Sequence, residues 1–302
     1  VRLLVPYKLH DYQVEVVRWL SRVEETGTDE GAARGGVLAM VMGLGKTVCS
    51  GGLICSSLEA QRNWVQTDSH GGTLYICPKN LLGTSRHELR KFFGDSLRVV
   101  VFHKGFGTGD FLRAYRNFDV VMTNYATAVR QFGLHRKSRK PGVVEKGSLT
   151  FQQTEWFRVV LDESHEIRNK KTLRYQAINM LRCTRRICMT GTPIHNGVQD
   201  LVAQLKFCGL TPPKRRQTKP DWERWVYSDE VVDKVRFVDY QDAATVKLPT
   251  LTEELVHFTL GVEERVVYNA YLDESLTLLQ EHSSEAQERH PPVFVKLRRN
   301  IL

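Results

Sequence analysis

The sequence predicts an α/β fold in which a parallel β-sheet is covered by helices on both faces. Short apolar runs recur along the chain, and most are separated by stretches of helical length or helical pattern. The runs are continuously apolar, which is typical of strands buried on both sides. The strands are predicted at residues 36–41, 74–77, 98–102, 119–123, 157–161 and 186–189.

A helix is predicted before the first strand, at residues 11–24. Its apolar residues recur at helical spacing and therefore share one face. They are Val16, Val17, Leu20 and Val23. Residues 25–35 are rich in glycine, threonine and glutamate, and we expect them to form the loop that leads into the first strand.

Residues 130–150 interrupt the alternation and are predicted to form a surface loop. Their basic run, residues 136–142, could contact a nucleic-acid backbone or could be a solvated insertion. Residues 214–216 are also basic, lie in a proline-rich turn and allow the same two interpretations. Beyond them, residues 262–272 have helical periodicity.

The turn after the first strand has the composition of a triphosphate-binding loop. It consists of Met42, Gly43, Leu44, Gly45, Lys46 and Thr47. Its glycines let backbone N–H groups close around phosphate oxygens, Lys46 can reach the β- and γ-phosphates, and the Thr47 hydroxyl can bind Mg²⁺. The strict signature has a glycine where this chain has Met40, so the loop is a weaker indication by itself.

Two adjacent carboxylates follow the strand predicted at 157–161. Phosphoryl transfer needs a carboxylate that holds Mg²⁺ and a group that orients the attacking water. Asp162 can serve as the first and Glu163 as the second. Because ligands of parallel sheets bind at the carboxyl ends of the strands, both acids are expected at the edge that carries the phosphate loop.

The composition is that of an ordinary globular protein with a basic surface. The chain has 302 residues, 41% of them hydrophobic and 25% charged, and its net charge is +9. This charge favours a polyanionic partner, most simply nucleic acid, although a generally basic surface would give the same value. No apolar run has the length of a membrane span or the features of a signal peptide. Because Val1 stands where an initiator methionine would, we expect an excised or processed chain.

The six cysteines do not have the spacing of a zinc site or a disulfide framework. None forms a Cys-x-x-Cys pair, and most lie in apolar runs. This usage indicates reduced thiols in an intracellular protein, which we expect to be nuclear if its source is a eukaryote.

Six sequence blocks resemble, in order, the motifs of the first ATPase lobe of SWI/SNF-type DNA translocases in helicase superfamily 2. They are Leu9–Gln13, Met42–Thr47, Leu74–Leu82, Val120–Tyr125, Asp162–Asn169 and Met189–Asn196. The strand Trp156–Leu161 and the basic insertion before it resemble the DNA-repair branch that includes helicase-like transcription factor.

The resemblance implies a RecA-like fold of the P-loop NTPase class that binds ATP and Mg²⁺. It implies that Gln13 reads adenine. The residues that it implies for coupling hydrolysis to DNA movement are His165, Thr190, Gly191 and Thr192. The residues that it implies for DNA contact are Pro78, Lys79, Thr123 and Asn124.

The chain departs from the family pattern at three places. Met40 and Val41 stand where the family usually has Asp-Glu, so two acids beside the phosphate loop are absent. His10-Asp11 replaces Arg-Pro in the adenine-reading segment. Ser164 replaces the commoner alanine, and we expect this small-for-small change to have no effect.

The resemblance also implies the domain organisation and the function. Residues 1–210 are expected to be the ATP-binding lobe, and residues 211–302 a mostly helical protrusion with the start of the linker to a second lobe of the same polypeptide. The expected function is that of a DNA-dependent ATPase that moves along double-stranded DNA and remodels protein–DNA or DNA structures, with chromatin or repair proteins as further partners and no membrane. A strand-separating DNA or RNA helicase and a DNA-binding scaffold that does not hydrolyse ATP remain as alternatives.

Overall fold

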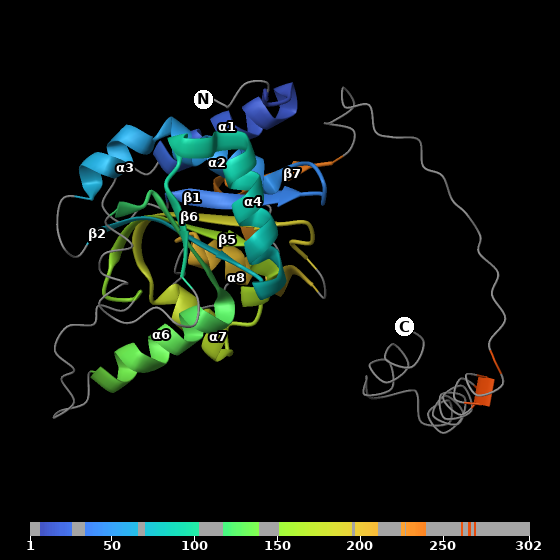
Figure 1. Ribbon diagram of the computed structural model, residues 1–302. Coiled ribbons are helices and arrows are strands. Elements are labelled where there is room, and N and C mark those ends of the chain that lie inside the picture. Colours follow the sequence, from blue (N-terminus) through green and yellow to red (C-terminus); the bar gives the residue numbers. More distant parts are fainter. Residues whose placement is uncertain are drawn as a thin grey trace. The chain divides into compact units, whose positions relative to one another are not determined.

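Seven parallel strands form one sheet within the part of the chain that the structure describes, in the order β3-β4-β2-β5-β6-β1-β7 (Figure 1). The strands are β1 (Gly35–Met40), β2 (His70–Cys77), β3 (Val99–Val101), β4 (Val120–Asn124), β5 (Glu155–Asp162), β6 (Arg182–Thr190) and β7 (Val235–Val238). The first six confirm the predicted strands, and β2, β5 and β6 are longer than expected.

The computed structural model describes most of the first 239 residues. The described residues are 7–25, 34–65, 70–102, 117–138, 151–194, 197–210, 225–226, 228–239, 261, 265–266 and 269. Contacts divide the chain into two units, Val1–Lys247 and Leu248–Leu302. In the second unit, the described residues 265, 266 and 269 are helical. Most of the predicted helical extension, the basic residues 214–216 and most of the loop predicted at 25–35 lie outside the described residues.

Strand β7 lies beyond residue 210, where the ATP-binding lobe was expected to end. It pairs in parallel with β1, with Val37 opposite Val235 and Met40 opposite Val238. The sheet therefore continues beyond residue 210, and the contacts divide the chain only after Lys247. Periodicity did not indicate this strand because it is only four residues long and because Phe237, within it, is exposed.

Helices cover both faces of the sheet (Figure 1). On one face lie α1 (Asp11–Glu25), α2 (Lys46–Ser56), α3 (Leu58–Trp64) and α4 (Leu82–Phe93). On the other face lie α6 (Tyr125–Ser138), α7 (Leu173–Asn179) and α8 (Val198–Phe207). The remaining described helical segments are α10 (Asp229–Val232), η1 (Lys79–Leu81), η2 (Gly94–Ser96) and η3 (Ser164–Ile167). None of the described helices is long and apolar enough to cross a bilayer.

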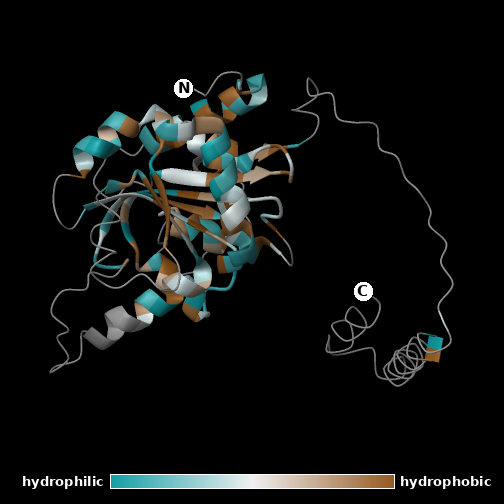
Figure 2. Ribbon diagram, in the orientation of Figure 1, coloured by the Kyte–Doolittle hydropathy of each residue, from teal (hydrophilic) through white to brown (hydrophobic). Residues whose placement is uncertain are grey.

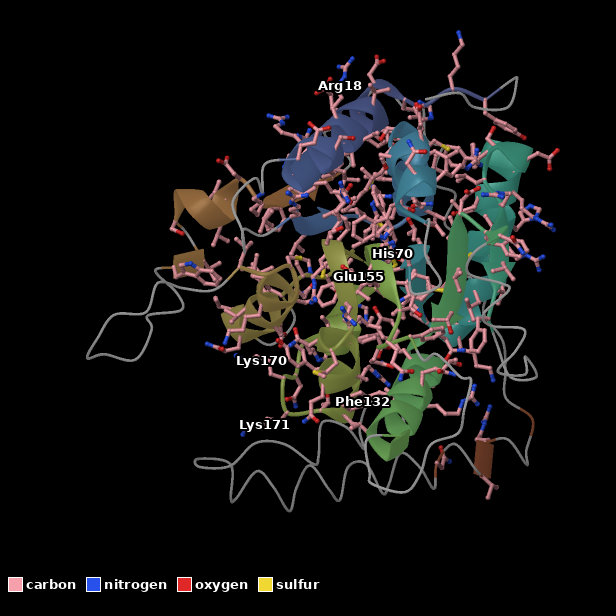
Figure 3. All side chains as sticks on the ribbon, turned by 90° about the vertical axis from the view of Figure 1, so that its left-hand side faces the viewer. Arg18, His70, Phe132, Glu155, Lys170 and Lys171 are labelled. Carbon is pink, nitrogen blue, oxygen red and sulfur yellow. The ribbon has the colours of Figure 1, made fainter. Side chains whose placement is uncertain are left out.

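Each face of the sheet has its own hydrophobic core. Alternate strand residues point to opposite faces, so Leu38 packs with α1, α2 and α4, whereas the neighbouring Val37 packs with α6, α7 and α8. Apolar residues are concentrated in the strands, and side chains occupy the space between sheet and helices (Figures 2 and 3). The sequence prediction of strands buried on both sides is confirmed.

Helix α6 corrects the prediction of a loop beginning at residue 130. It starts directly after β4 and continues to Ser138, so the first basic residues of the run 136–142 belong to a helix. Residues 139–150 lie outside the described residues.

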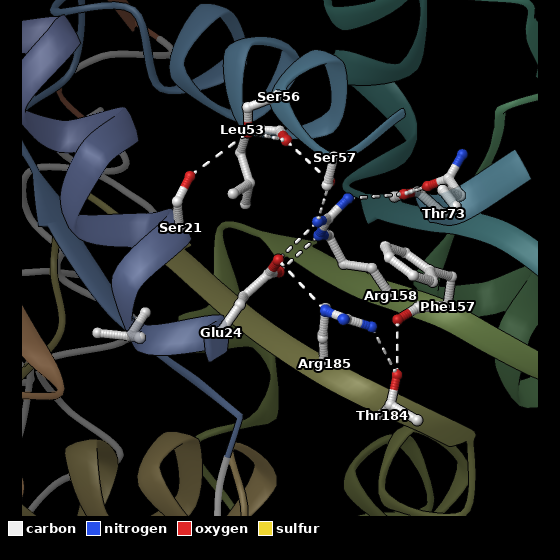
Figure 4. A network of polar contacts seen from close by, with 12 residues as sticks. Ser21, Glu24, Leu53, Ser56, Ser57, Thr73, Phe157, Arg158, Thr184 and Arg185 are labelled. Carbon is white, nitrogen blue, oxygen red and sulfur yellow. Dashed lines mark hydrogen bonds and ion pairs between the residues drawn. The ribbon is translucent and has the colours of Figure 1, made fainter. Parts of the chain in front are cut away.

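A buried ion pair connects α1 to the middle of the sheet (Figure 4). Arg158 of β5 is fully buried and donates to both carboxylate oxygens of Glu24, at 2.5 Å each. It also donates to the hydroxyls of Ser57, at 2.7 Å, and Thr73, at 3.3 Å. The Arg185 guanidinium lies 3.7 Å from Glu24 and over the Phe157 ring. In this bidentate geometry, the charges of Arg158 and Glu24 are partners for each other, as a buried ion pair requires.

Candidate active site

The loop between β1 and α2 has the backbone of an anion-binding turn. Gly43 and Gly45 have φ angles of 85° and 89°, which lie in the left-handed region that favours glycine. Helix α2 begins at Lys46 without a side-chain cap, so the N–H groups of its first turn point toward the loop without a side-chain acceptor. This arrangement is suited to phosphate oxygens.

Lys46 connects the loop to the end of β5. Its ammonium group donates to the carbonyl of Met40 at 3.2 Å and lies 3.6 Å from Oε1 of Glu163. Only 9% of the lysine side chain is exposed. The Met40 side chain is fully buried in the core, so the absent acid at this position leaves no gap in the site.

Glu163 has the features of a strained functional residue. It is the one described residue other than glycine with a positive φ, at φ 49° and ψ 53°. This conformation costs on the order of 1 kcal/mol in a residue with a side chain. Its Oε2 atom is buried and accepts no hydrogen bond from a described residue, although His165 Nδ1 lies 3.3 Å away. A carboxylate oxygen without a donor in a buried site is available to a water molecule or a ligand.

Two buried tyrosines hold Asp162 in place. The Tyr75 hydroxyl donates to Oδ2 of Asp162 at 3.0 Å, and the Tyr125 hydroxyl donates to the Asp162 carbonyl at 2.9 Å. Burial, together with the neighbouring charge of Glu163, raises the pKa of Asp162 to about 6. Sequence reasoning missed both tyrosines. The available signal for Tyr75 was a hydroxyl group within an otherwise apolar strand. In the sheet, Tyr75 pairs with Val160 on the adjacent β5.

The predicted magnesium ligands converge on one of these tyrosines. The Tyr75 hydroxyl interacts with Thr47 as well as with Asp162. The site is rich in oxygen atoms. It contains the buried Asp162 carboxyl group, whose pKa is raised, and a Glu163 oxygen without a donor. Such a site suits a hard divalent cation. The residues present therefore fit Mg²⁺ bound together with a triphosphate.

Gln13, which the resemblance implies for reading adenine, lies against the phosphate loop. Its side-chain nitrogen donates to the Leu44 carbonyl at 3.0 Å, and its oxygen accepts from the His10 backbone N–H at 3.1 Å. The Tyr12 hydroxyl donates to the same Leu44 carbonyl at 2.9 Å. The replacement of Arg-Pro by His10-Asp11 leaves α1 intact, because the helix begins at Asp11 and keeps Gln13 in its first turn.

The residues that the resemblance implies for coupling lie beside Asp162 and Glu163. His165 Nδ1 is 3.2 Å from the Thr190 hydroxyl, which also accepts from the Thr192 N–H at 3.0 Å. A Cβ atom built on Gly191 would lie 3.4 Å from Met42. The end of β6 is therefore next to both the phosphate loop and the end of β5.

Ser164, which stands where the family more often has alanine, makes a contact of its own. Its hydroxyl is buried and donates to Oε1 of Gln204 in α8 at 2.6 Å. Alanine could not make this bond.

The residues implied for DNA contact have different environments. Pro78 and Asn124 lie at the same edge of the sheet, because Cys77 pairs with Asn124 in neighbouring strands. Lys79 is exposed. Thr123, however, is fully buried and donates to the Phe102 carbonyl, and the buried Asn124 side chain accepts from the Thr127 N–H. Both side chains therefore bond within the protein, and the DNA contact expected of these two residues stays a prediction.

Comparisons with known proteins agree with this site. A model of the SNF2-related domain matches residues 12–300. An uncharacterised ATP-dependent helicase of Schizosaccharomyces pombe is 32% identical over 216 residues, which cover 69% of this chain and 20% of that protein. DNA repair protein RAD5 of Yarrowia lipolytica is 30% identical over 282 residues, which cover 84% of this chain and 26% of that protein. The chain thus spans about a fifth to a quarter of the length of these two relatives.

A solved structure has the same fold. The SWI2/SNF2 ATPase core of Sulfolobus solfataricus, in complex with double-stranded DNA, matches with a TM-score of 0.58 at 23% identity, over 100% of this chain and 60% of that chain. The family match over nearly the whole sequence, the RecA-like sheet and the converging phosphate and carboxylate residues agree with one another. The chain therefore belongs to the SNF2-related domain family, as an ATPase lobe of the SWI/SNF type in helicase superfamily 2.

Proposed function

We propose that this chain is the ATP-binding lobe of a DNA-dependent ATPase that moves along double-stranded DNA and remodels protein–DNA or DNA structures. The observation that carries this proposal is the convergence of Lys46 and Thr47 with Asp162 and Glu163 at one edge of the sheet. The net charge of +9 and the described complex of the Sulfolobus core with double-stranded DNA support a DNA partner.

Each residue has a distinct role in this proposal. Lys46 neutralises charge on the terminal phosphates, Thr47 and Asp162 hold Mg²⁺, and Glu163 orients the attacking water and accepts its proton. Bound ATP would supply the phosphoryl group. Bound Mg²⁺ would neutralise the negative charge that develops on it. The left-handed backbone at Glu163 directs its carboxylate toward Lys46 and His165.

The test is ATP hydrolysis by the intact protein, with and without duplex DNA, beside Lys46→Ala and Glu163→Gln. We expect stimulation by duplex DNA that both substitutions abolish. DNA binding without any turnover in the intact protein would contradict the proposal and favour a scaffold.

A strand-separating helicase is the second candidate, because one relative is named an ATP-dependent helicase. A strand-displacement assay on the intact protein distinguishes the two functions. A translocase is expected to hydrolyse ATP on duplex DNA without releasing a strand.

We also propose that the 302-residue chain alone hydrolyses ATP very slowly. A second lobe of the same polypeptide would supply arginines to the site, and an arginine finger contributes about 10³–10⁵ to the rate in related phosphoryl-transfer enzymes. Fast DNA-stimulated turnover by the purified chain would contradict this.

A further inference from the structure

A buried polar pair joins the catalytic strand to α8. Ser164 directly follows Glu163, Gln204 lies in α8, and both are fully buried. The Ser164 hydroxyl donates to Oε1 of Gln204 at 2.6 Å. The pair differs from the contact between His165 and Thr190. Ser164 and Gln204 are fully buried, whereas the His165 side chain is 31% exposed.

Gln204 extends this connection to the segment after β6. Its side-chain nitrogen donates to the carbonyl of Pro193 at 3.0 Å and to that of Asp200 at 3.3 Å. Both carbonyls can only accept, so the amide nitrogen must face them. The amide oxygen then requires a donor, and the Ser164 hydroxyl supplies it. The orientation of Gln204 is therefore determined by its partners on both sides.

The two ends of this connection lie at the two parts of the site that must act together. On one side, Ser164 begins η3 where the chain leaves the left-handed conformation of Glu163. On the other side, Pro193 belongs to the same segment as Gly191, which is next to the phosphate loop. A displacement of either segment would strain the hydrogen bonds of Gln204.

We propose that Ser164 and Gln204 are positioning residues that couple the carboxylate of Glu163 to the 190–193 segment. The inference rests on the proposed ATPase function and deepens it. Neither residue touches the reacting atoms. Together they hold the two segments in one arrangement, so that a change at the phosphates and a change in the 190–193 segment occur together.

The test compares three variants of the intact protein: Ser164→Ala, Gln204→Leu and the double variant. Each single change removes one partner and leaves a polar group buried, whereas the double change replaces both partners by apolar groups and is expected to recover part of the lost melting temperature. The bond to the Pro193 carbonyl is still lost. We therefore expect kcat of the double variant to be reduced about 5- to 10-fold with little change in KM for ATP, as for one buried hydrogen bond that acts during turnover.

The chain contains a matched control pair at the other end of the sheet. Thr73 donates to Oε1 of the buried Gln61 at 2.6 Å, and Gln61 donates to the Asp119 carbonyl at 2.8 Å. The two hydrogen bonds are of the same kind, although the Thr73 hydroxyl also accepts from Arg158, and the pair does not belong to the active site. The double variant Thr73→Val/Gln61→Leu is expected to keep kcat within about twofold of the unsubstituted protein, since distant sites act independently.

Hydrogen exchange gives a second measurement that does not depend on turnover. Amides of the 190–194 segment are expected to exchange faster in the double Ser164/Gln204 variant than in the control variant. Unchanged exchange or unchanged kcat in a folded double variant, or an equal loss of kcat in the control, would overturn the inference. If the double variant does not fold, Ser164→Ala decides the question by the same measurements.

The proposed function and this inference fail in different ways. An intact protein without DNA-stimulated hydrolysis removes the proposed function, and unchanged exchange at 190–194 removes the coupling. If unsubstituted protein hydrolyses ATP and the Gln204 variants do so equally well, the inference alone is wrong.

Discussion

The amino-terminal half of β5 and its carboxyl end both contain buried charges, but they hold them differently. Arg158, in the first region, contacts Glu24 through two bonds of 2.5 Å. At the second, Lys46 and Glu163 are 3.6 Å apart, and one Glu163 oxygen accepts no hydrogen bond from a described residue. The backbone is also strained at Glu163 alone among the described residues other than glycine.

This difference separates a contact that maintains the fold from one prepared for a ligand. Breaking a fully paired buried ion pair leaves an uncompensated charge, so the first arrangement resists change. Loosely paired charges retain the capacity to bind another group. The same strand therefore supports the structure at one end and the proposed chemistry at the other.

The largest effect is expected from a substitution in the loosely held pair of Lys46 and Glu163. Glu163→Gln should lower DNA-stimulated kcat of the intact protein by about 10²–10⁴-fold, the usual contribution of a general base. Its melting temperature should remain close to that of the unsubstituted protein, because the lost ion pair is long. Glu166→Gln is the matched control, since Glu166 pairs with Arg174 instead of Lys46. Equal losses in both variants would contradict the role of Glu163.

The next largest effect is expected from a substitution in the tightly held pair of Arg158 and Glu24. Arg158→Met should destabilise the protein by about 3–5 kcal/mol, because Glu24 is left buried without its main partner. The double variant Arg158→Met/Glu24→Met should recover most of this loss. Urea unfolding of all three proteins measures the difference. A loss from the single change below about 1 kcal/mol, the median for exposed pairs, would show that the pair is not functioning as a buried one.

A smaller effect isolates the backbone strain. With the carboxylate removed in both cases, Glu163→Gly should be more stable than Glu163→Ala by about 1 kcal/mol, since glycine tolerates the left-handed conformation. Thermal unfolding checks this. If the alanine variant is the more stable, the backbone has relaxed and the strain is not imposed by its surroundings.

A pH-dependent effect concerns a second carboxylate, Asp119, which precedes β4. Burial alone would raise the pKa of Asp119, but hydrogen bonds from Arg62 and Arg98 outweigh it and lower the pKa to about 2. A lowered pKa stabilises the folded state above the unfolded pKa near 3.9, and this contribution is lost as the pH falls from about 4 to 2. It amounts to about 3 kcal/mol at neutral pH, at about 1.4 kcal/mol per pKa unit.

Asp119→Asn should therefore flatten the stability profile between about pH 4 and 2, and urea unfolding across that range measures it. An unchanged slope would assign the acid sensitivity to other groups. The pKa of Asp162 is shifted in the opposite direction, to about 6. The fully paired carboxylate therefore has a lowered pKa, and the carboxylate in the candidate active site a raised one.

The local elements could be predicted from the sequence. Six of the seven strands, the helix that carries Gln13, the phosphate loop and the carboxylate pair all follow from continuous apolar runs, helical spacing and short motifs. These signals are contained within a few neighbouring residues, because backbone conformation and burial periodicity depend mainly on near neighbours in the chain. The sequence alone therefore determined the fold class and the catalytic residues that we propose.

The partners of these residues were decided only by the tertiary structure. Arg158 and Glu24 are 134 positions apart in sequence, and Ser164 and Gln204 are 40 apart. Tyr75 reaches Asp162, and β7 reaches β1, only through the register of the sheet. Which side chains meet depends on how strands align and which face each residue presents, and these are properties of the packed sheet as a whole. The same dependence explains why Thr123 is buried and why the Ser164 hydroxyl meets Gln204.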